Sequence, residues 1–471
     1  MIKRLVKRIL SRLRELVLHW TRTSSLFAAF YIWWVTFAVK HFIRKKNAYT
    51  ALDWLLNAVR RIPDLNKTKH LRELARAIIQ ERCCDAEGNF LPHEQNKLYD
   101  DFLQSSKFAP ARNEFANQPI EERRRLRYYR ENQGIERQGN LIMLKPFNAQ
   151  TGEKGVLVCK YNTTASHLAA AFDLRKLLQN YRIVFEPSFH RNIEPDLFLY
   201  NGQGFRQVFQ CVQEADAAVL GGVPHCFELV PTVSADYIDT EIFNAPAPGT
   251  VKEYDLAMVA SWLKIKRHRA VMKGLGEWKK IRPDFKAVFV GYPFDLHLTD
   301  IQKFARQYGV ESNCTFFERI PSSQVSEILQ KSRMSINFSE YEGMPKACYE
   351  SLFCDVPLIV YKHNHGFRLS WINEKTGMLA DDNELAAVME YIRTHSEQFS
   401  PREFVSSRAG YENATRILND ALKKTALENG EPWTLDIAAK KNGSHLVPNY
   451  ITEADRLAME PHYADLEQYL S

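Results

Sequence analysis

Cysteine is scarce and scattered in this sequence. Its 471 residues include eight cysteines, of which only Cys83 and Cys84 are adjacent, and no C-x-x-C pair occurs. Disulfide frameworks and cysteine-based zinc sites need regularly spaced pairs, so both are excluded. A reduced cytosolic setting is therefore predicted, and Cys348 is expected to fill a core rather than to act as a nucleophile.

Acidic residues are almost missing from the N-terminal end. Residues 1–46 contain eleven Lys or Arg and one acidic residue, Glu15, whereas the whole chain has a formal net charge of +7. The rest of the chain is therefore close to neutral. A basic end on a neutral body predicts contact with a local anionic surface and speaks against general nucleic-acid binding.

The first part of this basic end is amphipathic. Within residues 1–20, the apolar side chains fall on one helical stripe, and the cations, including Arg4, Lys7 and Arg8, lie mostly off it. A basic amphipathic helix of this kind lies in the interface of an anionic membrane. We therefore expect these three residues to contact an anionic membrane surface.

Residues 26–39 are uncharged and aromatic, and include Trp33 and Trp34. These 14 residues are fewer than the ~20 that a spanning helix needs, and tryptophan favours the headgroup boundary. No small-residue cleavage site follows, which speaks against a signal peptide. We predict a peripheral or monotopic anchor on the cytoplasmic face of the cell membrane. A short transmembrane span and a helix pair packed on the protein's own core are the alternatives.

Residues 47–140 show a helix-like spacing of apolar residues. A second basic cluster lies at 123–130, where five arginines are interleaved with Tyr128 and Tyr129. Either a solvated helix face or a contact with lipid or another polyanion explains this cluster, and the sequence leaves both open.

From residue 155 onward, strand-like and helix-like stretches alternate, which predicts an α/β fold with parallel sheets covered on both faces. In the first half, strands are expected at 155–160, 182–185, 197–199 and 226–230, with helices at 167–179 and 205–218. In the second half, strands are expected at 254–260, 287–291, 314–320, 334–338 and 376–380, with a helix at 268–279.

The most informative stretch is 339–351. A short strand is followed by a turn that carries Glu342 and Gly343, and then by a helix for which Pro345 suits the first position. The free N–H groups of such a helix start favour an anion such as phosphate. Glu342 and Glu350 flank it, and carboxylates bind the vicinal hydroxyls of sugars and ribose. The stretch therefore suits a nucleotide sugar, although two glutamates at this spacing also occur by chance.

The sequence around this stretch resembles the retaining GT-B glycosyltransferases of family four, the glycosyl transferases group 1. The resemblance rests on the Glu342–Glu350 spacing, the following V-P-L-I strand and T-G turn, and the D-Y-I-D-T-E-I-F segment at 236–243. Asp355 and Tyr237 stand where the family usually has glycine. The resemblance covers residues 220–395 clearly and 155–220 weakly.

The resemblance implies a GT-B fold, in which two Rossmann-like domains face a cleft. It implies an acceptor domain (141–248), a nucleotide-sugar donor domain (249–410) and a helical tail that crosses back to the acceptor domain (411–471). The resemblance says nothing about residues 1–140, where composition and spacing predict a membrane-associating segment (1–46) and a helical extension (47–140).

The resemblance also implies roles for residues of the donor domain. Glu342 and Lys266 are the expected catalytic residues, because Glu342 would bind the donor sugar and Lys266 the departing diphosphate. The expected donor-binding residues are Lys264, Gly291, Gly343, Met344, Pro345, Lys346 and Glu350. The family has an arginine in the loop after the first strand of this domain, where this chain has Ser261 or Trp262.

In this family a residue of the N-terminal domain, commonly a histidine, often supports the donor sugar. His167 is the best-placed candidate, and His190 and His225 are others, although a structural histidine is the commoner case for each. No D-x-D pair occurs, so neither a metal nor another cofactor is expected. The expected partners are a UDP- or GDP-sugar and a glycan or lipid-linked acceptor. The alternative is a catalytically degenerate GT-B protein that serves as a membrane-bound scaffold.

Overall fold

The computed structural model describes residues 24–45, 47–62, 64, 66–116, 141–160, 162–187, 193–202, 206–211, 227–442 and 450–470. The predicted membrane residues Arg4, Lys7 and Arg8 and the basic cluster at 123–130 lie outside them. The chain forms two compact units. The first unit comprises the described residues up to Pro231 together with 418–438 and 450–470. The second comprises 232–417 and 439–442.

A six-stranded parallel sheet organises the second unit. Its strands are β6 (Tyr254–Val259), β7 (Ala287–Gly291), β8 (Cys314–Glu318), β9 (Ser332–Asn337), β10 (Leu358–Tyr361) and β11 (Gly377–Ala380). Their order is β11-β10-β9-β6-β7-β8, the order of a doubly wound Rossmann-like sheet. The direction of winding reverses between β6 and β9, so a crevice for ligands is expected at their carboxyl ends.

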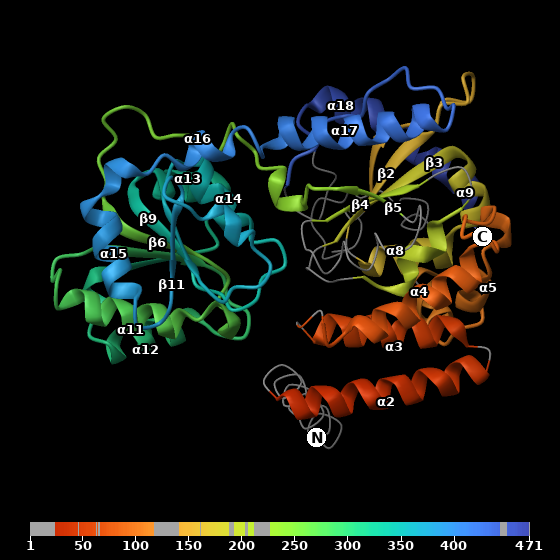
Figure 1. Ribbon diagram of the computed structural model, residues 1–471. Helices are drawn as coiled ribbons and strands as arrows, with labels where there is room; N and C mark the ends of the chain where they lie inside the picture. The colour runs from red at the N-terminus through yellow and green to blue at the C-terminus, as the bar shows by residue number, and fades with distance from the viewer. Residues whose placement is uncertain are drawn as a thin grey trace. The chain divides into compact units, whose positions relative to one another are not determined.

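Helices cover both faces of this sheet (Figure 1). One face packs on α11 (His268–Lys279), α12 (Leu298–Gln307) and α15 (Leu385–Thr394). The other carries α13 (Ser322–Gln330), α14 (Lys346–Phe353) and α16 (Pro401–Val405). The core between the sheet and the first set of helices includes Trp262 and Trp278, both fully buried. The strands and the helix expected in this half are confirmed, with shifts of a few residues at their ends.

The first unit contains a five-stranded sheet of order β1-β2-β3-β4-β5. Its strands are β1 (Leu141–Lys145), β2 (Gly155–Lys160), β3 (Tyr181–Glu186), β4 (Gln207–Gln210) and β5 (Phe227–Val230). Strands β2 to β5 are parallel, and β1 is an antiparallel edge strand. The structure therefore confirms the α/β class with two Rossmann-like sheets.

Three local predictions for the first unit are wrong. The apolar run 197–199 lies in a 3-10 helix, η3 (Pro195–Tyr200), rather than a strand. Residues 207–210, expected in a helix, form β4. The helix expected at 167–179 is two helices, α8 (Asn162–Ala171) and α9 (Leu174–Asn180), because Asp173 caps a new helix start by accepting the N–H groups of Arg175 and Lys176.

The N-terminal region is helical as far as the structure describes it. Its helices are α2 (Ser25–Arg44), α3 (Ala48–Arg61), α4 (Lys69–Cys83), α5 (Lys97–Leu103) and α6 (Phe108–Ala116). Helix α2 has 20 residues and so extends beyond the uncharged stretch 26–39 at both ends. Within the described residues it alone is long and apolar enough to cross a membrane, by length and composition.

The boundary between the units precedes the predicted one, because the segment after Thr232 belongs to the second unit. Asp236 is fully buried there and forms an ion pair with Arg368, whose two terminal nitrogens lie 2.6 and 2.8 Å from its carboxylate oxygens. At the other end, α17 (Tyr411–Glu428) begins in the second unit. Its part from Leu418 onward belongs to the first unit, and so does the described tail except for 439–442.

Candidate functional site

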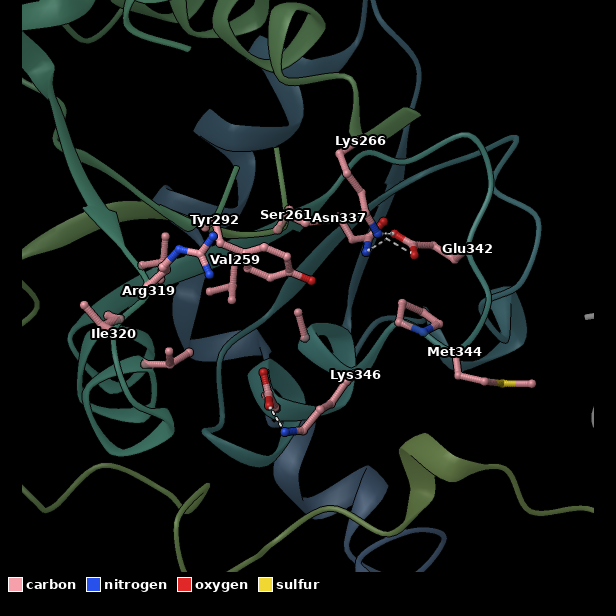
Figure 2. A pocket seen from close by; sticks show the side chains of 17 residues that line it. Val259, Ser261, Lys266, Tyr292, Arg319, Ile320, Asn337, Glu342, Met344 and Lys346 are labelled. Atoms are coloured by element: carbon pink, nitrogen blue, oxygen red, sulfur yellow. Dashed lines mark hydrogen bonds and ion pairs between the residues drawn. The ribbon is translucent and has the colours of Figure 1, made fainter. Parts of the chain in front are cut away.

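A pocket of about 330 Å³ lies at the carboxyl ends of β6 to β9, at the reversal of the winding. Glu342 and Glu350 line it, and Figure 2 shows Glu342 with Lys266. So do six other residues singled out from the sequence, namely Ser261, Lys266, Gly291, Met344, Pro345 and Lys346. The structure thus brings together residues that lie far apart in the sequence, such as Lys266 and Glu350, which are 84 positions apart.

Lys266 and Glu342 form an ion pair in this pocket. The Lys266 Nζ lies 2.6 Å from each carboxylate oxygen of Glu342, whose side chain is 6% exposed. Asn337, the last residue of β9, donates from Nδ2 to Glu342 Oε1 at 3.1 Å. Residues at the ends of two neighbouring strands therefore hold the Glu342 carboxylate, because Lys266 follows β6 and Asn337 is the last residue of β9.

The turn that carries Glu342 is fastened by the loop after β10. The Glu342 N–H donates to the carbonyl of His365 at 2.7 Å, and the His365 N–H donates to the carbonyl of Glu340 at 3.1 Å. Gly366 has φ +118°, and a Cβ there would lie 2.0 Å from the Glu342 carbonyl oxygen. Only glycine allows this close approach, so the loop sets the backbone position of Glu342.

Glu350 lies on α14 and pairs with Lys346 one turn earlier, with 3.1 Å between Nζ and Oε1. Burial raises the pKa of Glu350 above its ordinary value of 4.5, and the nearby ammonium of Lys346 opposes this rise. Pro345 is the N-cap of α14, so its expected place as the first helical residue is wrong by one position.

The remaining predicted residues lie in different surroundings. Gly291 is needed for close packing, because a Cβ there would lie 2.3 Å from Trp262 Nε1. Lys264 is exposed and Gly343 is buried, and neither lines the pocket. His167 lies half-buried in α8 of the first unit, and the weaker candidates at 190 and 225 lie outside the described residues.

Sequence reasoning missed three pocket residues: Asn337, Tyr292 and Arg319. Tyr292 and Arg319 lie on the other side of the pocket from Lys266 and Glu342 (Figure 2). Each of the three ends a parallel strand or directly follows one. In a doubly wound sheet, polar side chains at such positions face the ligand crevice, and this signal was available in the sequence.

His268 begins α11 two residues after Lys266 and is 2% exposed. Burial lowers its pKa to about 4, and the positive charge of Lys266 adds to this effect. The histidine is therefore neutral at pH 7, which spares the site a second buried cation beside Lys266.

One departure from the family pattern has a local explanation. Asp355, at the usual glycine position, has φ +57°, the left-handed region that ends helices. Aspartate tolerates this conformation better than most side chains, and here Asp355 Oδ1 also accepts the N–H of Arg402 at 3.0 Å. The departure preserves the backbone that follows α14.

The comparison with family models finds one match, Glycosyl transferases group 1, over residues 241–408. Residues 241–408 are therefore similar to a group 1 glycosyltransferase domain. This domain contains Lys266, Glu342 and Glu350 and the whole six-stranded sheet. The comparison with curated proteins finds no match.

Solved structures of glycosyltransferases are similar to the chain at low identity. Sucrose-phosphate synthase from Thermosynechococcus elongatus is 15% identical with a TM-score of 0.45, covering 58% of this chain and 73% of that one. HepE from Anabaena, in complex with UDP and glucose, is 12% identical with a TM-score of 0.45, covering 57% of this chain and 78% of that one.

Proposed function

We propose that this protein is a retaining glycosyltransferase that moves a sugar from a nucleotide-sugar donor, a UDP- or GDP-sugar, to a glycan or lipid-linked acceptor. The proposed place of the reaction is the cytoplasmic face of the cell membrane, in envelope polysaccharide or glycolipid synthesis. The observation that carries the donor proposal is the pocket at the ends of β6 to β9, where two glutamates each pair with a lysine.

The two glutamates suit the two diols of a nucleotide sugar. In the proposed complex Glu350 accepts the hydroxyl hydrogens of the ribose, and Glu342 accepts those of the donor sugar. Backbone N–H groups at Gly343 and Met344 contact donor oxygens or phosphate. The base lies beside Arg319 and Ile320, which follow β8 and line the pocket.

Lys266 supplies the charge that the leaving group needs. Its ammonium is neutralised by Glu342 in the structure, at 2.6 Å. A diphosphate that enters the pocket competes for this ammonium, and the negative charge it develops as the sugar departs is stabilised there. Lys264, exposed in the structure, is proposed to assist from the rim.

The proposed reaction keeps the anomeric configuration of the donor, with front-face attack by the acceptor hydroxyl. The donor phosphate takes the acceptor proton, so no separate protein base and no metal or other cofactor is required. His167 is a candidate for contact with the donor sugar from the first unit.

The donor proposal is tested by thermal unfolding of the full chain with UDP-, GDP-, ADP- and CMP-sugars, beside Glu350→Gln. A matched control is Glu327→Gln, which removes the carboxylate of another lysine pair at helical spacing, exposed on α13. At 100 times its dissociation constant, a donor should add ~2.7 kcal/mol of stability to the unsubstituted chain and to Glu327→Gln. Glu350→Gln should lose most of this gain.

Absence of any shift in the folded, unsubstituted chain would contradict the proposal and favour the scaffold alternative. Anomeric retention has its own test, NMR of the sugar released by slow donor hydrolysis. The first anomer to appear should be that of the donor, and appearance of the opposite anomer would contradict retention.

A further inference from the structure

Helix α2 has two apolar faces, and the residues that the structure describes cover one of them. Ala28, Tyr31, Val35 and Val39 recur at helical spacing and are buried. This face lies along α3, and the two helices run side by side (Figure 1). The Tyr31 hydroxyl also accepts a hydrogen bond from Arg61 Nη1 at 2.9 Å, which ties the end of α3 to α2.

The opposite face of α2 is exposed and aromatic. Leu26 is 86% exposed, Phe30 60%, Trp33 62% and Phe37 65%, and Trp34 stands at the edge of this face at 41%. The four side chains recur every three to four residues, so they form one continuous stripe along the helix. Among the described residues, this is where large exposed apolar side chains gather on a single element. We call it the aromatic stripe.

The charges around the aromatic stripe are all positive. Residues 24–45 contain no Asp or Glu, and Lys40, Arg44 and Lys45 follow the stripe at the C-terminal end of α2, all exposed. An aromatic face bordered by cations matches the boundary between the acyl chains and the headgroups of an anionic leaflet. A second copy of this chain with its α2 parallel to the first would bring the same cations together and repel.

The packing of α3 decides how α2 can lie. Helix α3 carries Asp53 and Arg60, and Arg60 pairs with Glu194 at 3.6 Å. Tyr49, also on α3, donates a hydrogen bond to Asp196, the second residue of η3. If α2 crossed the bilayer, α3 along its flank would bring these charged groups to hydrocarbon depth, at high cost.

We propose that α2 lies in the plane of the membrane, with the aromatic stripe among the acyl chains of an anionic leaflet and α3 on the side away from it. The proposal deepens the membrane location given in the proposed function and rests on it. The donor site contains no residue of α2, so a failure of either proposal leaves the other testable. Residues 24–45 thus attach the first unit to the membrane surface without spanning it.

Binding of the full chain to vesicles tests the surface. The protein is sedimented with vesicles of phosphatidylcholine that contain about 30% phosphatidylserine, roughly one anionic lipid in three. Phe30→Ser with Phe37→Ser should lower the partition coefficient by about 100-fold or more, since each buried phenylalanine contributes about tenfold. The control Leu457→Ser, which removes an apolar side chain 56% exposed on α18 of the same unit, should bind like the unsubstituted chain.

The same double variant should keep its thermal shift with the nucleotide sugar that the unsubstituted chain binds, which shows that it is folded. Unchanged vesicle binding by a folded double variant would overturn the proposal and assign membrane binding to other residues. A dimer of the unsubstituted chain that the double variant loses, in sedimentation without lipid, would overturn it in favour of a second copy.

Depth measurements separate the in-plane helix from a span. Nitroxide labels on Leu26→Cys, Phe30→Cys and Phe37→Cys, each corrected for labelling of the native cysteines, report depth by their accessibility to oxygen and to a nickel chelate. An in-plane helix places the three labels at one depth, within about 5 Å. A spanning helix separates the first and last by ~16 Å along the bilayer normal, at 1.5 Å per residue, and this result would overturn the proposal.

Discussion

The two units end their parallel strands in charged residues and use them differently. In the first unit, Lys160 at the end of β2 stands beside Glu186 at the end of β3; both are buried, with 4.0 Å between Nζ and Oε1. In the second unit, Lys266 and Glu342 also pair, but both line a pocket. The two ion pairs thus lie at the same kind of sheet edge, one at buried strand positions and one in a pocket.

The difference lies in the loops rather than in the sheets. Lys160 and Glu186 are themselves strand residues, so neighbouring backbone surrounds them. Lys266 and Glu342 lie beyond their strands, on a 3-10 turn and on a turn held by the loop at Gly366. A charged pair inside the strands stabilises or destabilises the fold, whereas one on the loops is available to a ligand. The following predictions test this contrast.

The largest effect is expected from Lys160→Met. It removes the cation that lies 4.0 Å from the buried Glu186 carboxylate, which should cost about 3–5 kcal/mol of unfolding free energy, measured by urea denaturation. Adding Glu186→Leu should recover part of this loss, because the buried carboxylate is then gone as well. A loss of donor affinity in Lys160→Met with no loss of stability would break the contrast between the two pairs.

Lys266→Met should act on the reaction instead. Removal of the charge that meets the diphosphate should lower donor turnover by about 10²–10³-fold, with a smaller loss of stability because the pocket opens to solvent. Donor hydrolysis and urea denaturation are measured on the same preparations. The control is Lys280→Met at the C-cap of α11, which removes an exposed ion pair with Glu277. It should change neither donor hydrolysis nor the free energy of unfolding.

Gly366→Ala tests whether the loop positions Glu342. The new Cβ would collide with the Glu342 carbonyl, so we expect a loss of about 1–3 kcal/mol of stability and weaker donor binding. Gly309→Ala is matched to it, because Gly309 also has positive φ, at +68°, but nothing lies within 4 Å of its added Cβ. It should cost about 1 kcal/mol and leave donor affinity intact. Equal effects of the two variants on affinity would show that the loop does not set the site.

The smallest effect concerns pH. In the proposed complex Glu350 accepts the ribose hydroxyls best when it is ionised, and burial raises its pKa above 4.5. As the pH is lowered, donor affinity, measured by calorimetry, should therefore begin to fall at a higher pH than it would for a glutamate with an ordinary pKa. Below the raised pKa, the affinity should fall by up to about tenfold per pH unit. The change of stability with pH has the opposite sign to the change of donor affinity. Because the folded state favours protonated Glu350, ionisation of this group lowers the stability as the pH rises through the same range. Glu350→Gln should lose this pH dependence.

The predictability of the fold differed between the two halves. In the second unit, β7 and α11 were predicted with their observed ends, because apolar runs between clear turns left one interpretation. In the first unit, Leu197–Leu199 was mistaken for a strand because a short apolar run has no period of its own. Only its packing under α3 and α5 shows that it is a 3-10 helix buried on all sides.

The candidate site was predictable where motif and spacing carried it. Glu342, Glu350 and Lys266 were found from the sequence and line one pocket, whereas Asn337, Tyr292 and Arg319 were not, because single residues after strands form no motif. Lys264 was taken together with Lys266 from their proximity in sequence. The 3-10 turn directs Lys266 to Glu342 and leaves Lys264 exposed.

The amino-acid sequence alone determined the α/β class, the donor-site glutamates and the basic, aromatic character of the N-terminal region, because each is written in local spacing and composition. Tertiary structure decided which charges became partners, which of the two faces of α2 is covered, and which lysine meets Glu342. These are long-range outcomes: residues 76 positions apart, such as Lys266 and Glu342, meet only because a doubly wound sheet brings the ends of β6 and β9 together.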